Sequence, residues 1–206
     1  MPWRRDGHNH GVWPPRLETL KSLLELPGAE GLRAGARQAA VAALLRENDG
    51  DLEVLLIRRA TFVGDPWSGH VALPGGHAVP DDRNLLATAQ RETLEEVGID
   101  LQGSAELLGQ LGEQSPMTGM ALTVTPFYFA LRDPVSVSLS REVDEVFWVP
   151  LGPIAEGQRD SVYRLDRGGT PLSFPAWQVG SALVWGLTYR LLSELLQRIR
   201  GGGPGP

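Results

Sequence analysis

Apolar residues recur along the chain with two kinds of spacing, which predict strands and amphipathic helices. The runs expected to be strands cover residues 39–45, 52–57, 70–73, 105–111, 122–131 and 146–149. The first run is apolar almost without a break, which is typical of a strand that is buried on both faces. Asn48-Asp49-Gly50 lies between the first two runs and predicts a hairpin turn. A smaller hairpin is expected over 163–165 and 171–174, around Gly168-Gly169.

Three other segments have helical spacing. Residues 16–26 predict a short amphipathic helix, 85–97 a helix rich in glutamate, and 175–199 a long C-terminal helix. The long helix would carry Leu183, Leu187, Leu191 and Leu195 on one side. Such a stripe is typical of a helix that packs into the core or pairs with a second copy in a homodimer. Strands interrupted by one helix and closed by another indicate an α+β or α/β layered domain.

Length and composition are those of one globular domain with extensions. The chain has 206 residues, of which 42% are hydrophobic, and this is enough to bury a core. We expect a single domain over 37–200, preceded by a tail and short helix over 1–36 and followed by a flexible tail over 201–206.

Charge and composition also exclude several classes of protein. The chain has no cysteine, so it has neither a disulfide framework nor a thiolate metal site. No apolar run is long enough to span a membrane, so we expect a cytoplasmic protein without a membrane partner. A formal net charge of −6 argues against a nucleic-acid polymer as partner, but it is compatible with a small anionic substrate.

The glutamates of the 85–97 helix are the strongest candidates for chemistry. Glu92, Glu95 and Glu96 stand at positions i, i+3 and i+4, which places them on one face of a helix. A row of like charges destabilises a helix, so a hard divalent cation such as Mg²⁺ or Mn²⁺ is expected to gather them. The alternative is an acidic face in solvent. Gly75-Gly76 before the helix and Gly98 at its end favour the site, because glycine lets backbone approach a ligand.

These parts together resemble the signature box of the Nudix hydrolases. The matching residues are Gly76 followed by Arg91-Glu92-Thr93-Leu94-Glu95-Glu96-Val97-Gly98-Ile99. The spacer is one residue longer than usual, its acidic residue is an aspartate (Asp81 or Asp82), and Thr93 replaces an aliphatic residue. The resemblance implies a mixed sheet sandwiched between helices, with the box as a loop-helix-loop.

The resemblance also implies roles for the residues of the box. Glu95 and Glu96 would be the main metal ligands, together with the carbonyl of Gly75. Glu92 would bind a further metal ion or help to activate water, and Arg91 would hold the glutamates in place. A further catalytic carboxylate commonly precedes a strand such as the one expected at 146–149.

Two glutamates are candidates for that further carboxylate. They are Glu142 and Glu145, of which Glu142 is preferred. The alternative is that both are solvated acids of a loop.

Segments outside the box are similar to the coenzyme A diphosphatases within this family. They are 55–60, 69–76, 145–151, 174–176 and 184–188. That group usually carries an arginine in the loop before Gly69, and here Gly64 stands near its place. Arg58 or Arg59 could contact a substrate phosphate instead. Trp67 could stack on an adenine, although a buried loop aromatic is the commoner arrangement.

The resemblance therefore implies hydrolysis of a diphosphate linkage in a small nucleotide derivative. Coenzyme A or a derivative is the first expectation, with 3′,5′-ADP and 4′-phosphopantetheine as products. ADP-ribose, dinucleotides or nucleoside triphosphates are the alternative substrates. An alternative of another class is a catalytically silent nucleotide-binding sensor, against which the intact Glu92, Glu95 and Glu96 argue.

Overall fold

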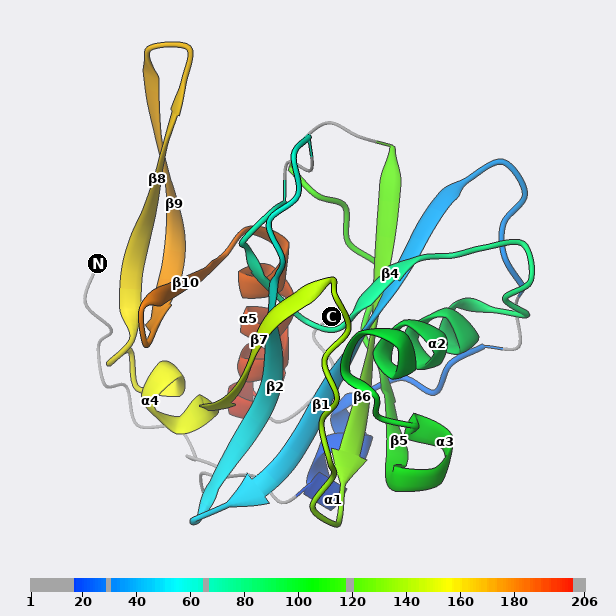
Figure 1. Cartoon of the computed structure of the whole chain (residues 1–206). Helices are drawn as coiled ribbons and strands as arrows, with labels where there is room; N and C mark the ends of the chain where they lie inside the picture. The colour runs from blue at the N-terminus through cyan, green and yellow to red at the C-terminus, as the bar shows by residue number, and fades with distance from the viewer. Residues whose placement is uncertain (1–16, 29–30, 65–66, 118–120, 202–206) are drawn as a thin grey trace.

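The computed structural model describes residues 17–28, 31–64, 67–117 and 121–201. Within these residues, seven strands form one mixed sheet (Figure 1). They are β1 (Arg37–Asn48), β2 (Asp51–Arg59), β3 (Val71–Ala72), β4 (Gly75–His77), β5 (Ala105–Gln110), β6 (Leu122–Leu131) and β7 (Val143–Pro150). The order is β3-β2-β1-β6-β5, with β4 paired to β1 and β7 paired to β2. Only the β1–β6 pair among these is parallel.

The first hairpin opens away from its turn, and this opening positions the glycines that precede the box. β1 and β2 pair only from Leu45↔Val54 to Asn48↔Asp51. Beyond that point β4 pairs with β1 and β3 pairs with β2. The β3–β4 segment therefore lies between the two diverging strands and brings Gly75 and Gly76 against the middle of the sheet.

Helices cover both faces of this sheet (Figure 1). They are α1 (Leu17–Leu20), the 3-10 helix η1 (Lys21–Leu23), α2 (Leu85–Val97), α3 (Leu101–Ser104), α4 (Leu151–Ala155) and α5 (Gly186–Gly201). On one face Leu44 of β1 packs in a core cluster with Ala89 of α2. On the other face Leu45 packs in a second cluster with Leu192 of α5. Strand β1 is therefore buried on both sides, as its unbroken apolar run predicts.

A second, smaller sheet stands beside the first. Its strands are β8 (Asp160–Arg167), β9 (Thr170–Val179) and β10 (Ala182–Trp185), in the order β10-β9-β8. Trp177 and Val184 join the core cluster beneath α5. The far end of the β8–β9 hairpin projects beyond the body of the molecule (Figure 1).

The predicted helix over 175–199 is wrong in its first half. Residues 175–179 belong to β9, 182–185 form β10, and the helix starts only at Gly186. Gly180 (φ 55°) and Gly186 (φ 65°) adopt left-handed backbone conformations, which end the two strands. The remaining stripe on α5 is core, because Leu191 and Leu195 are fully buried. Leu183 lies on β10 and is not part of it.

Most other elements agree with the pattern of the sequence. Helix α2 and strand β6 have the predicted bounds. The predicted helix over 16–26 is shorter, with α1 and η1 ending at Leu23, and its first residue lies outside the described residues. Leu20 and Leu23 join the main core. The flexible tail was expected over 201–206, but Gly201 is the last residue of α5, and residues 1–16 and 202–206 lie outside the described part of the chain. Strand β4 and helix α3 were not predicted.

Candidate active site

Helix α2 has well-defined ends that fix the position of its glutamates. Its N-cap is Asn84, whose side chain accepts a hydrogen bond from the Ala87 amide (2.9 Å). The helix is therefore capped by Asn84 and not by an aspartate of the spacer. Gly98 ends the helix with φ 71°, and its N–H donates to the Leu94 carbonyl. Glu95 and Glu96 thus lie in the last turn, where the helix dipole disfavours negative charge and other groups must stabilise them.

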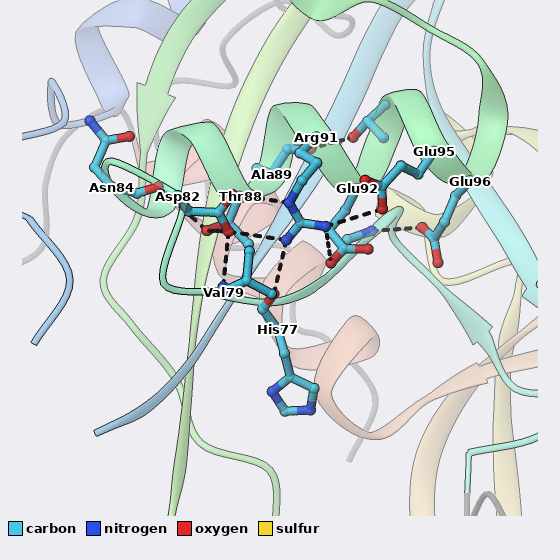
Figure 2. Close-up of polar contacts among 12 residues, drawn as sticks. His77, Val79, Asp82, Asn84, Thr88, Ala89, Arg91, Glu92, Glu95 and Glu96 are labelled. Atoms are coloured by element: carbon cyan, nitrogen blue, oxygen red, sulfur yellow. Dashed lines mark hydrogen bonds and ion pairs between the residues drawn. The ribbon is translucent and has the colours of Figure 1, made fainter. Parts of the chain in front are cut away.

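Asp82, the buried aspartate of the spacer, holds the guanidinium of Arg91 (Figure 2). Its carboxylate accepts hydrogen bonds from Arg91 Nε (3.0 Å) and Nη2 (3.0 Å). Thr88 Oγ1 (2.8 Å) and the Val79 amide (3.1 Å) also donate to it. Asp82 is only 8% exposed, and its pKa is lowered chiefly by the bond from Arg91. The four donors satisfy a carboxylate that would otherwise be costly to bury.

Arg91 in turn binds two glutamates of the box. Its Nη1 donates to Glu92 Oε1 (2.8 Å) and to Glu95 Oε2 (3.1 Å). Its Nη2 also donates to the His77 carbonyl (3.0 Å), so β4 is tied to the same guanidinium. Arg91 therefore has the bonds expected of a residue that holds the glutamates in place, and Figure 2 shows it between Asp82 and this acidic face.

Glu96 is the most deeply buried of the glutamates. It is 2% exposed, and its Oε2 accepts a hydrogen bond from the Gly75 amide (2.8 Å). Burial raises the pKa of Glu96 to about 7, with smaller contributions from the negative charges of Glu92 and Glu142. The Gly75 bond and the positive charge of Arg59 act in the opposite direction on this pKa. A carboxylate held at this cost is typical of a functional site.

The two glycines before the helix are required by close contacts. A Cβ at Gly76 would lie 2.5–2.7 Å from the carboxylate atoms of Glu92. Gly75 has φ 147°, and a Cβ there would lie 2.3 Å from the Ala40 carbonyl oxygen. Burial also raises the pKa of Glu92, although Arg91 opposes this effect. The glycines thus let backbone lie directly against the acidic face.

Glu142 and Glu145 are separated by the structure. The negative charge of Glu142 contributes to the raised pKa of both Glu92 and Glu96, so its carboxylate lies near the box. Its backbone carbonyl accepts a hydrogen bond from the Ala60 amide (2.9 Å). Glu145 instead forms an ion pair with Arg58 (3.3 Å). Of the two glutamates, Glu142 is the one whose charge acts on the box, and its role stays a prediction.

Arg58 and Arg59 also have different surroundings, because neighbours on a strand point to opposite faces. The charge of Arg59 acts on Glu96, as described above. Arg58 lies against Glu145, Ser181 Oγ (3.4 Å) and the ring of Phe147 (5.3 Å). Arg59 is therefore the arginine of the pair that the structure brings towards the box.

Trp67 lies in the segment between β2 and β3. Trp67 is half-buried, and its carbonyl accepts a hydrogen bond from the His70 amide (3.2 Å). Its stacking role therefore stays a prediction.

The residues of the box fit a hard divalent cation by their chemistry. Glu92, Glu95 and Glu96 offer carboxylate oxygens from one helix face, and the backbone of Gly76 lies close against the carboxylate of Glu92. Within the described residues, no three acidic or histidine side chains already converge in the manner of a formed metal centre. Arg91 and the Gly75 amide supply the positive partners of these carboxylates.

Two threonines of α2 contribute in ways that the pattern of apolar residues does not reveal. Thr88 bonds Asp82, as described above. Thr93 is fully buried where the family usually has an aliphatic residue, and its Oγ1 donates to the Ala89 carbonyl (2.7 Å). This local bond satisfies the hydroxyl, so threonine is tolerated there. The i, i+4 spacing from Ala89 to Thr93 is the only signal in the sequence that could have indicated it.

Comparisons with known proteins agree with this geometry. Residues 36–165 match the family model described as the NUDIX domain. The chain is 32% identical over 175 residues to the human "Mitochondrial coenzyme A diphosphatase NUDT8", covering 83% of this chain and 73% of that protein. It is 42% identical over 109 residues to "Uncharacterized protein C14C4.10c" of Schizosaccharomyces pombe, covering 49% of this chain. The match spans only 32% of the length of the yeast protein.

A solved structure supports the fold alone. It is that of a MutT/nudix family protein from Enterococcus faecalis, with a TM-score of 0.50 and 21% sequence identity. The superposition covers 85% of this chain and 64% of the bacterial one. The predicted mixed sheet between helices is thereby confirmed.

Proposed function

The chain belongs to the Nudix family, and on this premise we propose that it is a divalent-metal-dependent hydrolase of a diphosphate linkage in a nucleotide derivative. The observation that carries the proposal is the arrangement of Glu92, Glu95 and Glu96 on one helix face, held by Arg91 and by the Gly75 amide. A module that only binds nucleotides has no need to keep three carboxylates on one helix face and to bury one of them, Glu96, among them.

The residues of the box would divide the work between them. Glu95 and Glu96, with the carbonyl of Gly75, would hold Mg²⁺ or Mn²⁺, and Glu92 would bind a further ion or help to activate water. A bound divalent cation neutralises phosphate oxygens and lowers the pKa of bound water. Arg91 keeps the carboxylates oriented, because Asp82 fixes its guanidinium from the other side.

Glu142 is the proposed proton acceptor. Its carboxylate comes from the loop before β7, and its charge is felt by Glu92 and Glu96. A carboxylate that approaches from outside the helix can take a proton from the attacking water while the helical glutamates bind the cation. The diphosphate bond then breaks with one phosphate as the leaving group, and both products carry a terminal phosphate.

Coenzyme A or a derivative is the proposed substrate, with 3′,5′-ADP and 4′-phosphopantetheine as products. The support is the name of the human relative and the similarity outside the box. Arg59 is the proposed phosphate contact, because its charge already acts on the site.

We propose a cytoplasmic location. The name of the human relative gives a mitochondrial one, and no helix among the described residues is long and apolar enough to cross a membrane.

A substrate panel with identified products tests the proposal. Coenzyme A, dephospho-coenzyme A, ADP-ribose, dinucleotides and nucleoside triphosphates would be incubated with Mg²⁺ or Mn²⁺, and the products separated by mass. The Glu96→Gln protein, purified in the same way, controls for contaminating hydrolases. We expect coenzyme A to be cleaved at the diphosphate. Brisk cleavage of ADP-ribose or a triphosphate without cleavage of coenzyme A would show that coenzyme A is not the substrate and that the cleaved compound is. Binding without turnover of any compound would indicate a sensor.

The two arginines supply a matched pair of variants for the same assay. Arg59→Ala should lower kcat/KM for coenzyme A by about 10-fold or more, the scale of one charge-assisted hydrogen bond to phosphate. Arg58→Ala should have little effect, since its partners are Glu145 and Ser181. If Arg59 contacts the 3′-phosphate, Arg59→Ala will lower kcat/KM less for dephospho-coenzyme A, which lacks that phosphate, than for coenzyme A. Equal losses would mean that Arg59 contacts the diphosphate and not the 3′-phosphate.

A further inference from the structure

Four aromatic side chains meet where the small sheet touches the main one. The ring of Tyr163 is stacked on Trp185 with centroids 3.7 Å apart. His70 approaches the edge of Trp185 at 5.0 Å, and Phe174 lies 5.7 Å from it. All four residues are half-buried. We call His70, Tyr163, Phe174 and Trp185 the aromatic cluster.

The strand register explains why these rings share one face. Tyr163 pairs with Phe174 across β8 and β9, and Trp185 pairs with Ala176 across β10 and β9. Directly opposed residues of antiparallel strands share a face, and so do residues two apart on one strand. The small side chain of Ala176 lets the rings on the outer strands meet above it.

Where β9 and β10 pair, the opposite face of the small sheet packs on the core. Trp177 and Val184 lie on it and pack into the cluster beneath α5. The aromatic cluster is therefore not part of that core.

The aromatic cluster is continuous with the candidate active site through His70. The Arg59 amide donates to the His70 carbonyl (3.0 Å), and the pairs Arg58↔Val71 and Ile57↔Ala72 set the register of these strands. In that register Arg59 and His70 are opposite each other, so their side chains leave the sheet on the same face. That face is the one covered by α2, because Ile57, two residues before Arg59 on β2, packs in a cluster with Ala89 of α2. The rings thus begin directly across from Arg59, on the face of the sheet that α2 covers.

We propose that the aromatic cluster binds the planar base of the nucleotide substrate, an inference that rests on the proposed function of the adjoining box. The order along this surface is carboxylates, then the cation of Arg59, then aromatic rings. A nucleotide diphosphate presents the same order, with phosphates at one end and a base at the other. Bases stack on partly exposed aromatic rings through their π-faces, and such stacking discriminates weakly among bases.

The test compares two ligands that differ only in the base and contain no diphosphate to hydrolyse. Binding of AMP and of ribose 5-phosphate would be measured by calorimetry in Mg²⁺ buffer for the full chain. Tyr163→Val removes the ring and keeps a side chain suited to a strand, whereas Tyr163→Phe keeps the ring. Val162→Thr is the matched control, because Val162 is 45% exposed on the opposite face of the same strand. His70→Leu provides a second loss of a ring if the first variant does not fold.

Wild-type protein should bind AMP more tightly than ribose 5-phosphate. Tyr163→Val should weaken AMP binding by about 5- to 20-fold and leave ribose 5-phosphate within about twofold, as expected for one stacked ring among several. Tyr163→Phe and Val162→Thr should bind like wild type. Equal affinity of the wild type for both ligands, or equal losses in Tyr163→Val, would overturn the proposal even if the protein hydrolyses diphosphates. Ring-dependent AMP binding without hydrolysis would instead refute the proposed function and leave the base site standing.

Discussion

Helices α2 and α5 cover opposite faces of the same sheet, yet they bury different chemistry (Figure 1). The buried side of α5 is almost entirely aliphatic, with Leu191, Leu192, Leu195 and Leu196 in the main core. The buried side of α2 includes Thr88, Thr93 and Glu96 beside its apolar residues. Burial of α5 therefore stabilises the fold, whereas part of the burial of α2 is used to hold polar groups.

The difference shows how a helix can be both a layer of the fold and part of a site. Thr93 satisfies its hydroxyl within α2, and Thr88 gives its hydrogen bond to Asp82. Glu96 has the Gly75 amide as a partner, but its raised pKa shows that one amide does not offset the cost of burying its charge. The unfavourable burial of charge in α2 is thus concentrated in one carboxylate, that of Glu96, next to the other glutamates of the box.

The largest expected effect is a loss of activity caused by a change in α2. Glu96→Gln keeps the size of the side chain and can still accept the Gly75 hydrogen bond, but it loses the charge that a cation needs. We expect kcat to fall on the order of 10²-fold or more. Steady-state kinetics with Mg²⁺, beside a circular dichroism spectrum of the variant, will measure it. A folded Glu96→Gln protein with most of its activity would contradict the assignment.

The complementary change in α5 should affect stability alone. Leu192 is fully buried beneath the sheet, so Leu192→Ala leaves a cavity and should lower the free energy of unfolding by about 2.5 kcal/mol. Chemical denaturation measures this loss, and kcat should stay near wild type for the folded fraction. A large fall in kcat without a loss of stability would show that α5 takes part in the site.

Removing the support of Arg91 should give a smaller effect on activity. Asp82→Asn removes the charge that holds the guanidinium, so Arg91 will orient Glu92 and Glu95 less well. We expect kcat to fall about 10-fold with little change in KM, the pattern of a residue that positions others. Asp81→Asn is the matched control, since Asp81 is the exposed neighbour. Equal kinetics of the two variants would show that Asp82 does not position Arg91 for catalysis.

The smallest expected effect is a gain in stability, opposite in sign to the loss expected for Leu192→Ala. The pKa of Glu96 is raised from 4.5 to about 7, so the stability linked to its proton is fully present below about pH 4.5 and is lost as the pH rises through about 7. In buffer with a chelator at pH 8, Glu96→Gln should therefore be more stable than wild type. We expect a gain on the order of 1 kcal/mol after local relaxation, disappearing near pH 4.5. Denaturation curves at both pH values will measure it, and a variant less stable than wild type at pH 8 would contradict the raised pKa.

Much of the fold could be predicted because local patterns and tertiary structure agree. The bounds of α2 follow from its apolar spacing and from Gly98, and the first hairpin follows from Asp49-Gly50, whose φ angles are both positive. The β9–β10 segment could not be predicted, because Leu183 also fits the helical spacing of Leu187, Leu191 and Leu195, and only the turn at Gly180 and packing on α5 exclude a helix there.

The candidate site was predictable to a similar extent. The glutamates stand out by their spacing, but the role of Asp82 depends on a loop that folds back over the start of α2. The choice of Arg59 over Arg58 was available from strand alternation, since Arg59 shares its face with Leu55 and Ile57, which pack beneath α2. The nearness of Glu142 to Glu96 is set by tertiary structure alone.

The central claim is that the acidic face of α2 holds a divalent cation. Crystals of the wild-type protein soaked in Mn²⁺ test it directly, because the anomalous signal locates the ion without reference to activity. We expect a peak bound by the carboxylates of Glu95 and Glu96, which should be lost in crystals of Glu96→Gln treated in the same way. A peak bound elsewhere on the chain, with none beside these glutamates at saturating Mn²⁺, would contradict the account.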